Sequence, residues 1–196
     1  MKRKQILDAA YVVFSRKGYH RATVDEIIAL ADTGKGTVYK YFVNKEQLFF
    51  ALIRERSLKF DTEIDHLATQ TNPPLEKVKQ AVKVFLEFYT ANAELWRVLM
   101  HEVRGFGRDG SATFSDTQIE KYRERFKHTI GVLEGILKEG IAQGVIRKCD
   151  VHKAAHGLFS VIIMMVFQGF VDEKKESIDS ATESITDVFL YGVAKS

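Results

Sequence analysis

The stretch 23–45 constrains the fold more than any other part of this chain. Thr23 and Glu26 have the spacing of a capping box, in which the Thr hydroxyl accepts from a backbone N–H and the Glu side chain reaches back, so a helix is expected to begin here. Gly34 and Gly36 are poor residues for a helix interior and predict a turn. A second short helix follows, and the stretch is therefore interpreted as helix, turn and helix.

The second short helix is expected to have an inward and an outward face. Val38 and Phe42 are four residues apart, which places both toward a core. A helix-turn-helix lays its second helix in the major groove of DNA, where side chains reach phosphates and base edges. The predicted DNA-contacting residues are Thr23, Lys35, Gly36, Thr37, Tyr39, Lys40, Tyr41 and Lys45.

These residues are expected to contact different parts of the DNA. The three lysines, and the hydroxyls of Thr23 and Tyr41, are suited to phosphates. Thr37 and Tyr39 are expected to contact bases or thymine methyl groups. Few of these groups can read a base with two parallel hydrogen bonds, so part of the sequence preference is expected to come from DNA shape.

The charge distribution supports this interpretation. Residues 1–45 carry nine Lys or Arg against four Asp or Glu, a net charge of +5, whereas residues 46–196 have a net charge of −2. Lysine and arginine displace the counterions condensed on DNA, so a basic module on a nearly neutral body suits phosphate binding. Basic ends that only aid solubility are the alternative explanation of the asymmetry.

Length and composition indicate a soluble and mainly helical chain. It has 196 residues, of which 45% are apolar, and only two prolines. No apolar run is expected to reach the roughly 18 residues of a membrane helix, and the start of the chain lacks the apolar core of a signal peptide. A lone cysteine, Cys149, excludes an intramolecular disulfide and suits a reducing compartment. The expected location is cytoplasmic, in a bacterial cell and associated with the nucleoid, with no membrane partner.

Helical spacing recurs along the whole chain, without the alternation typical of strands. Besides the two short helices, helices are expected at about 2–17, 44–67, 75–92, 95–104, 115–143, 150–171 and 180–194. The expected fold is all-α with about nine helices. It would comprise a DNA-binding head over residues 1–46 and an effector-binding and dimerisation domain over residues 47–196. No Gly- or Ser-rich linker separates the head from the fourth helix, which indicates a mechanical connection.

Many residues near the N-terminus recur in the register of a known family. They are Ile6-Leu7-Asp8-Ala9-Ala10, Phe14, Gly18-Tyr19, Thr23, Ile27-Ile28, Ala31, Lys35-Gly36-Thr37, Tyr39, Tyr41-Phe42 and Lys45-Glu46-Gln47-Leu48. This part of the chain resembles the N-terminal domain of the Tet repressor family of bacterial transcription regulators. Asp32 and Gly34 depart from the family's pattern, which usually has Gly and a small hydroxyl residue there.

The resemblance implies an apolar cavity for a small effector in the second domain. The predicted effector-binding residues are Phe85, Phe88, Tyr89, Trp96, Met100, His101, Arg104, Tyr122, Phe126 and Ile163, with Glu102 as a further polar candidate. Large apolar clefts with few polar groups suit such ligands. The alternative for most of these side chains is an ordinary core.

The helix expected after Asp150 is apolar on nearly every side, and such a helix must be covered on every side. Pairing of the last two helices across a two-fold axis would cover it and would present two heads to a palindromic operator. The predicted dimer contacts are Phe159, Met164, Met165, Phe167, Val188 and Phe189.

Other kinds of site are weakly indicated. Cys149, His152 and His156 have metal-binding side chains but lack an evident fourth ligand, so neither a metal nor a cofactor is expected. The Lys35 region fails as a phosphate-binding loop because Gly, not Ser or Thr, follows the lysine. No catalytic arrangement is recognised. The alternatives left open are a dimeric DNA-binding protein without an effector, and a helical enzyme or lipid carrier with a basic head.

Overall fold

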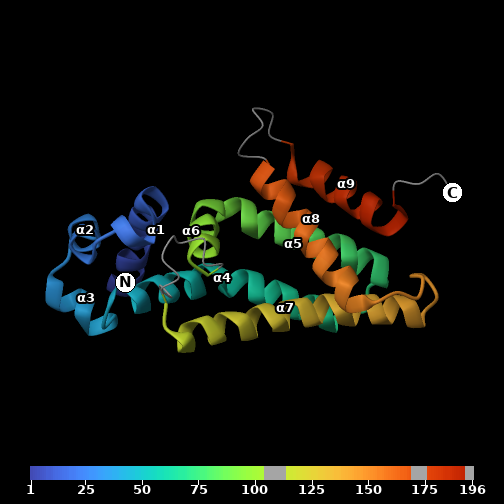
Figure 1. The fold of residues 1–196 in the computed structure, drawn as a ribbon, viewed down its shortest axis with the longest axis horizontal. Helices are drawn as coiled ribbons and strands as arrows, with labels where there is room; N and C mark the ends of the chain where they lie inside the picture. The colour runs from blue at the N-terminus through green and yellow to red at the C-terminus, as the bar shows by residue number, and fades with distance from the viewer. Residues whose placement is uncertain (104–113, 169–175, 193–196) are drawn as a thin grey trace. The chain divides into compact units, whose positions relative to one another are not determined.

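A computed structural model of the chain describes residues 1–103, 114–168 and 176–192. Within these ranges the chain forms nine α-helices and no strand, which confirms the predicted all-α class (Figure 1). The helices are α1 (Lys2–Arg21), α2 (Val24–Leu30), α3 (Lys35–Tyr41), α4 (Lys45–Thr69), α5 (Pro74–Ala91), α6 (Ala93–Val103), α7 (Asp116–Ala142), α8 (Val151–Gln168) and α9 (Ile178–Tyr191).

The helices form two compact units. One comprises Met1–Leu58 with Asn92–Tyr122, and the other comprises Lys59–Ala91 with Arg123–Ser196. Helices α4 and α7 each contribute a segment to both units. The boundary expected after residue 46 divides the chain by function instead, and it stays a prediction.

The first unit is built around α1, which packs against α2, α3 and α6. Phe14 is fully buried at its centre and makes an edge-to-face contact with Phe49 of α4, with ring centroids 5.0 Å apart. Helix α1 is broken at Gly18, whose φ of 74° favours glycine. The break allows Tyr19 to stack on Phe14, with ring centroids 5.9 Å apart.

In the second unit, α5 packs against both α8 and α9. Its inner face is apolar and continues into an aromatic cluster, described below. One charged residue is also buried there: Lys77 is 3% exposed and its ammonium lies 2.8 Å from the carboxylate of Glu139 on α7. An ammonium buried to this extent requires such a partner.

Several predicted helix ends are confirmed. The side chain of Asn44 accepts from the backbone N–H of Gln47 at 2.8 Å at the start of α4. Asp150 accepts likewise from the N–H of Lys153 at 3.1 Å at the start of α8. Gly144 has a φ of 73° just beyond α7. The glycine-containing segment 105–110, which follows the helix expected at about 95–104, lies outside the described residues, as do the predicted last residues of the final two helices.

Helix α8 requires a correction. It has 18 residues and a mean hydropathy of 1.3, so by length and composition it could cross a membrane, although the sequence was not expected to hold such a run. Only 17% of the helix is buried. The expectation failed because Gly, Ser and His residues interrupt the run without adding charge, and Lys153 is its one Lys, Arg, Asp or Glu.

A close approach at the end of α7 gives the first prediction. A Cβ added to Gly140 would lie 2.5 Å from Cδ1 of Ile146, whereas one added to Gly131 would meet nothing within 4 Å. Gly140→Ala is therefore expected to lower the free energy of unfolding by about 1–3 kcal/mol. Gly131→Ala should raise it by roughly 0.5–1 kcal/mol because alanine favours a helix. Urea denaturation of both variants checks this, and equal effects would contradict the packing described.

Candidate functional site

The capping box at the start of α2 is present as predicted. The backbone N–H of Glu26 donates to the hydroxyl of Thr23 at 3.3 Å, and the carboxylate of Glu26 accepts from the N–H of Thr23 at 3.1 Å. The same carboxylate pairs with Lys17 of α1, and this hydrogen bond is the main reason that the pKa of Glu26 is lowered. The pair ties the first two helices together at the surface.

The turn between α2 and α3 forms a Schellman motif. The N–H of Thr33 donates to the carbonyl of Ile28 at 3.3 Å, and the N–H of Asp32 donates to the carbonyl of Ala29 at 3.2 Å. Asp32 occupies the left-handed position, with a φ of 43°. A glycine would fit this position with less strain, and this is where the sequence departs from the Tet repressor pattern.

Helix α3 has the two faces expected from its sequence. Val38 and Phe42 are 1% and 4% exposed and close the head. Tyr39 and Tyr41 are 43% and 44% exposed, which is unusual for large aromatic side chains, and Lys40 beside them is also exposed. Aromatic and cationic groups thus share the outer surface of one short helix. Gly36 is also exposed and Thr37 is half-buried.

Lys35 opens α3 and is held only loosely. Its ammonium lies 3.5 Å from the carboxylate of Asp25 and 6.0 Å from the ring centroid of Tyr39. The side chains of Lys35 and Asp25 are 67% and 77% exposed, and exposed ion pairs of this kind are worth about 0–1 kcal/mol. The lysine can therefore exchange this partner for a phosphate at little cost.

Lys45 is placed differently from the other lysines. Its ammonium donates to the backbone carbonyls of Tyr19, His20 and Ala22 at 3.0, 3.3 and 3.2 Å, and it lies 4.6 Å from the ring centroid of Tyr19. Burial lowers its pKa. Three N–H groups are all that a lysine has to offer. A phosphate contact would require the ammonium to leave the end of α1.

The predicted effector residues lie in both units. In the second unit, Phe85, Phe88 and Tyr89 of α5 surround Phe60 of α4, and the rings of Phe60 and Phe88 stack at 4.3 Å. Phe126 of α7 joins this aromatic cluster through Phe159 of α8, whose ring contacts those of Phe126, Phe85 and Tyr89.

Ile163 is half-buried in the same unit. In the first unit, the ring centroids of Trp96 and Tyr122 are 6.2 Å apart. Met100 is half-buried and His101 is exposed. Arg104 lies outside the described residues.

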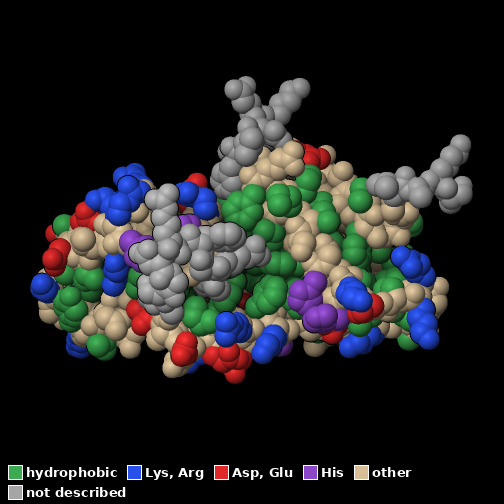
Figure 2. Space-filling view, in the orientation of Figure 1, with side chains coloured by type: hydrophobic (Ala, Val, Ile, Leu, Met, Phe, Trp, Pro, Cys, Tyr) green, Lys and Arg blue, Asp and Glu red, His purple; other side chains and the backbone are tan. Residues whose placement is uncertain are grey.

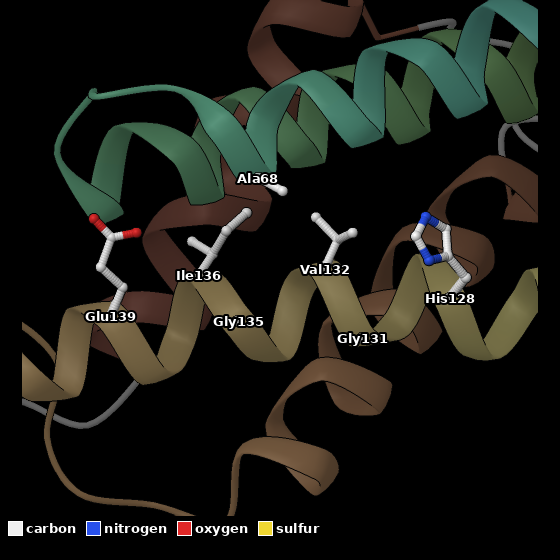
Figure 3. Close-up of a pocket in the computed structure, with 7 residues that line it drawn as sticks. All are labelled: Ala68, His128, Gly131, Val132, Gly135, Ile136 and Glu139. Atoms are coloured by element: carbon white, nitrogen blue, oxygen red, sulfur yellow. The ribbon is translucent and has the colours of Figure 1, made fainter.

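Three cavities within the described residues do not coincide with this aromatic set. One of about 460 Å³ follows α7, where the side chains of Val132 and Ile136 point toward Ala68 of α4 (Figure 3). It is also lined by His128, Gly131, Gly135 and Glu139. One of about 480 Å³ lies between α1 and α2. The third, of about 280 Å³, lies between the end of α1 and α6 and includes the predicted residue His101.

The third cavity has a basic lining that was not predicted from the sequence. It is lined by Arg16, Lys17, Gly18, Tyr19, His20, Arg21, Arg97, Val98, His101 and Glu102. The residues of α1 and α6 that line this cavity are about 80 positions apart in the chain, so the sequence does not show that they lie together. The one local indication of a basic site is the run of basic residues at the end of α1.

Comparison with known proteins identifies the family to which this helical chain belongs. Residues 6–52 match the family profile described as "Bacterial regulatory proteins, tetR family", and residues 71–192 match "Tetracyclin repressor-like, C-terminal domain". The two profiles together span most of the chain and both parts of the fold. The chain belongs to the TetR family.

TetR-family relatives include regulators of fatty acid metabolism. A fatty acid metabolism regulator protein of Bacillus subtilis is 27% identical over 194 residues, covering 98% of this chain and 95% of the relative. The structure of the B. subtilis transcriptional regulator FadR in complex with stearoyl-CoA is 26% identical, with a TM-score of 0.80, and covers 97% of this chain and 99% of that one. The fatty acid degradation regulator FadR of Bacillus halodurans is 25% identical, with a TM-score of 0.79, 97% coverage of this chain and 99% of that one.

The TetR assignment confirms that the N-terminal helix-turn-helix is a DNA-binding element and that the chain is a transcriptional regulator. A family of regulatory proteins also agrees with the expectation that the chain is not an enzyme.

Asp32 gives a prediction about the turn. Asp32→Gly should relieve backbone strain of about 1 kcal/mol or less and should also remove a negative charge from the head. Asp32→Asn removes only the charge, because asparagine tolerates the left-handed conformation about as well as aspartate does. Both variants should bind DNA more tightly at low salt, but only Asp32→Gly should melt at a higher temperature. A higher melting temperature for Asp32→Asn alone would contradict this explanation.

Proposed function

We propose that the protein is a homodimeric transcriptional repressor that binds a palindromic operator and is released by a long-chain acyl thioester of coenzyme A. The observation that carries the proposal is the outer surface of α3. There Lys40 lies beside Tyr39 and Tyr41, on a helix whose other face is closed by Val38 and Phe42. The protein would act in the bacterial cytoplasm, on the nucleoid.

The proposed DNA contacts follow from what each side chain is free to do. Lys35 and Lys40 hold phosphates, and Tyr41 adds a hydroxyl that can donate to a phosphate oxygen. Thr37 and Tyr39 face the bases, and the absence of a side chain at Gly36 lets the backbone approach the DNA. Thr23 keeps its hydroxyl in the capping box and reaches DNA only at the edge of the surface, and Lys45 acts chiefly by holding the end of α1.

The dimer proposal rests on an uncovered apolar face. Met164 of α8 is 65% exposed and Val161 is 40% exposed, while Val188 and Tyr191 of α9 are 47% and 71% exposed. Hydrophobic side chains gather over α8 in the space-filling view (Figure 2). A soluble protein rarely leaves such a patch open, and a second copy would cover it.

The predicted interface residues do not all face outward. Phe159 lies within the second unit, with its ring centroid 5.0 Å from that of Phe126 and 6.0 Å from that of Phe85. Met165, Phe167 and Phe189 are half-buried. We therefore assign the centre of the proposed interface to Met164 and Val188.

The effector proposal comes from the relatives and from the aromatic cluster. The structure of a 26% identical regulator is a complex with stearoyl-CoA. A long acyl chain needs an apolar lining, and the side chains around Phe88 and Phe126 can supply one by rotating apart. Helix α4 runs without a break from the helix-turn-helix into the second unit. An effector that favours one position of α4 would change operator affinity in proportion to its preference.

One observation favours the alternative of a DNA-binding dimer without an effector. The aromatic side chains of the second unit pack on one another, and the cavities described are lined by other residues. In that case the second unit would serve only to dimerise, and stearoyl-CoA would not bind.

A footprint tests the DNA-binding part of the proposal. The protein should protect a palindrome upstream of its own gene, with half-sites separated by a multiple of about 10 base pairs. Affinity for the palindrome should fall steeply with salt, because several phosphates are neutralised. Weak, salt-insensitive binding without a protected palindrome would refute the proposal.

A further inference from the structure

We propose that the basic cavity between the end of α1 and α6 binds the phosphate groups of the effector's coenzyme A portion. The inference rests on the proposed function and adds to it a site for the charged end of the ligand. All residues of this cavity lie in the first unit, so the ligand would contact α1, the helix at the centre of the DNA-binding head.

The charge of the lining favours an anion. Four Lys or Arg side chains line the cavity, with Glu102 as the one acidic residue among them. Lys17 and Arg97 have acidic partners nearby, Glu26 and Glu94. Even with these two carboxylates counted, the cations remain in excess.

The arginines keep donors free for a ligand. Arg16 is exposed and makes no hydrogen bond or ion pair within the described part of the chain. Among the described residues, Arg21 has one partner: its Nε donates to the carbonyl of Lys17 at 3.2 Å. Arg97 meets Glu94 through Nε and one terminal nitrogen, at 3.2 and 2.6 Å, and no described residue accepts from its other terminal nitrogen. Planar guanidinium groups suit bidentate contacts with phosphate.

Two features that would repel an anion are neutralised. The C-terminal end of a helix carries partial negative charge. At α1 the carbonyls of Tyr19, His20 and Ala22 accept from the ammonium of Lys45, which cancels this charge.

The acidic residue of the lining is covered. The side chain of Glu102 is 5% exposed, and its oxygens lie 2.9 Å from Nε2 of His20 and 3.2 Å from Nδ1 of His101. The two imidazoles are 64% and 57% exposed. Each therefore turns toward solvent with its second ring nitrogen able to contact a ligand.

The size of the cavity fits one end of a ligand. Its volume of about 280 Å³ lies at the lower limit for a pocket that encloses a whole drug-sized molecule, roughly 300 Å³. It can hold phosphate groups, while an acyl chain requires the apolar lining of another site. The cavity would thus select thioesters of coenzyme A over free fatty acids.

Calorimetric titration of the full-length protein without DNA tests this assignment. The ligands are stearoyl-CoA and stearate, and the proteins are wild type, Arg16→Ala/Arg97→Ala and the control Arg147→Ala. Arg147 is an exposed arginine of the second unit. The double variant should bind stearoyl-CoA about tenfold or more weakly, since two charge-assisted contacts are lost, and should bind stearate like wild type. Arg147→Ala should change neither affinity.

Other outcomes separate the possible failures. Unchanged affinity of the double variant for stearoyl-CoA would overturn the phosphate site and leave the proposed function standing. An equal loss of affinity for stearoyl-CoA and for stearate would have the same two consequences. If wild type binds no stearoyl-CoA at all, the proposed effector fails and this site fails with it.

DNA phosphate is the other source of the same chemistry. If the double variant loses operator affinity as Lys40→Ala does but binds stearoyl-CoA normally, the cavity serves DNA and the proposal is wrong. The arginine-to-lysine double variant should recover part of the thioester affinity, and an unchanged circular dichroism melting curve should accompany each substitution.

Discussion

Replacing Met164 and Val188 with aspartate is expected to produce a folded monomer that binds the operator at least about 100-fold more weakly. The two side chains lie on α8 and α9 and are 65% and 47% exposed, so the subunit itself loses little packing. In the dimer the substitutions would bury four carboxylates without partners, which costs several kcal/mol. A monomer also presents a single recognition helix to an operator with two half-sites.

Sedimentation equilibrium and fluorescence anisotropy measure the two effects separately. Val145→Asp is the matched control, because Val145 is 50% exposed but lies in the turn after α7, away from the proposed interface. It should remain dimeric and bind the operator normally. A dimeric double variant with full operator affinity would show that another surface joins the subunits.

Lys40→Ala and Tyr39→Ala are expected to damage DNA binding in different ways. Removal of the Lys40 ammonium should weaken binding to operator and random DNA alike. It should also reduce the magnitude of the slope of log affinity against log salt concentration by about 1. Tyr39→Ala should weaken operator binding by about 1–3 kcal/mol, with little change on random DNA, because it removes a base contact.

Anisotropy titrations at several salt concentrations distinguish these roles. Lys59→Ala serves as the control, since Lys59 belongs to the second unit and its side chain is 83% exposed. It should leave both affinities and the salt slope unchanged. Identical effects of the Lys40 and Tyr39 variants on random DNA would contradict the roles assigned to them.

Features decided by near neighbours in the chain could be predicted from the sequence. The capping box of Thr23 and Glu26, the cap at Asn44 and the break at Gly18 each depend on contacts within a few residues, and each is present. The outward position of Tyr39 and Tyr41 followed from the helical spacing of Val38 and Phe42, the buried apolar residues on either side of them.

Features decided by distant contacts could not be predicted in this way. Lys45 reads as a surface lysine, yet its ammonium is taken by carbonyls more than twenty residues earlier in the chain. Arg16 and Arg97 line the same cavity only because α1 packs on α6. The positions of aromatic residues in a sequence also do not reveal whether their rings pack against one another, as those of Phe60 and Phe88 do, or line a cavity.

Release of DNA by the effector is the central step of the proposed regulation. Stearoyl-CoA should be titrated into the preformed complex of the protein with its operator, with coenzyme A alone and stearate in parallel, and operator affinity followed by anisotropy. We expect the thioester to lower operator affinity at least about tenfold, which corresponds to a 1.4 kcal/mol preference for the form that does not bind DNA. Tight binding of stearoyl-CoA with unchanged operator affinity would contradict the account.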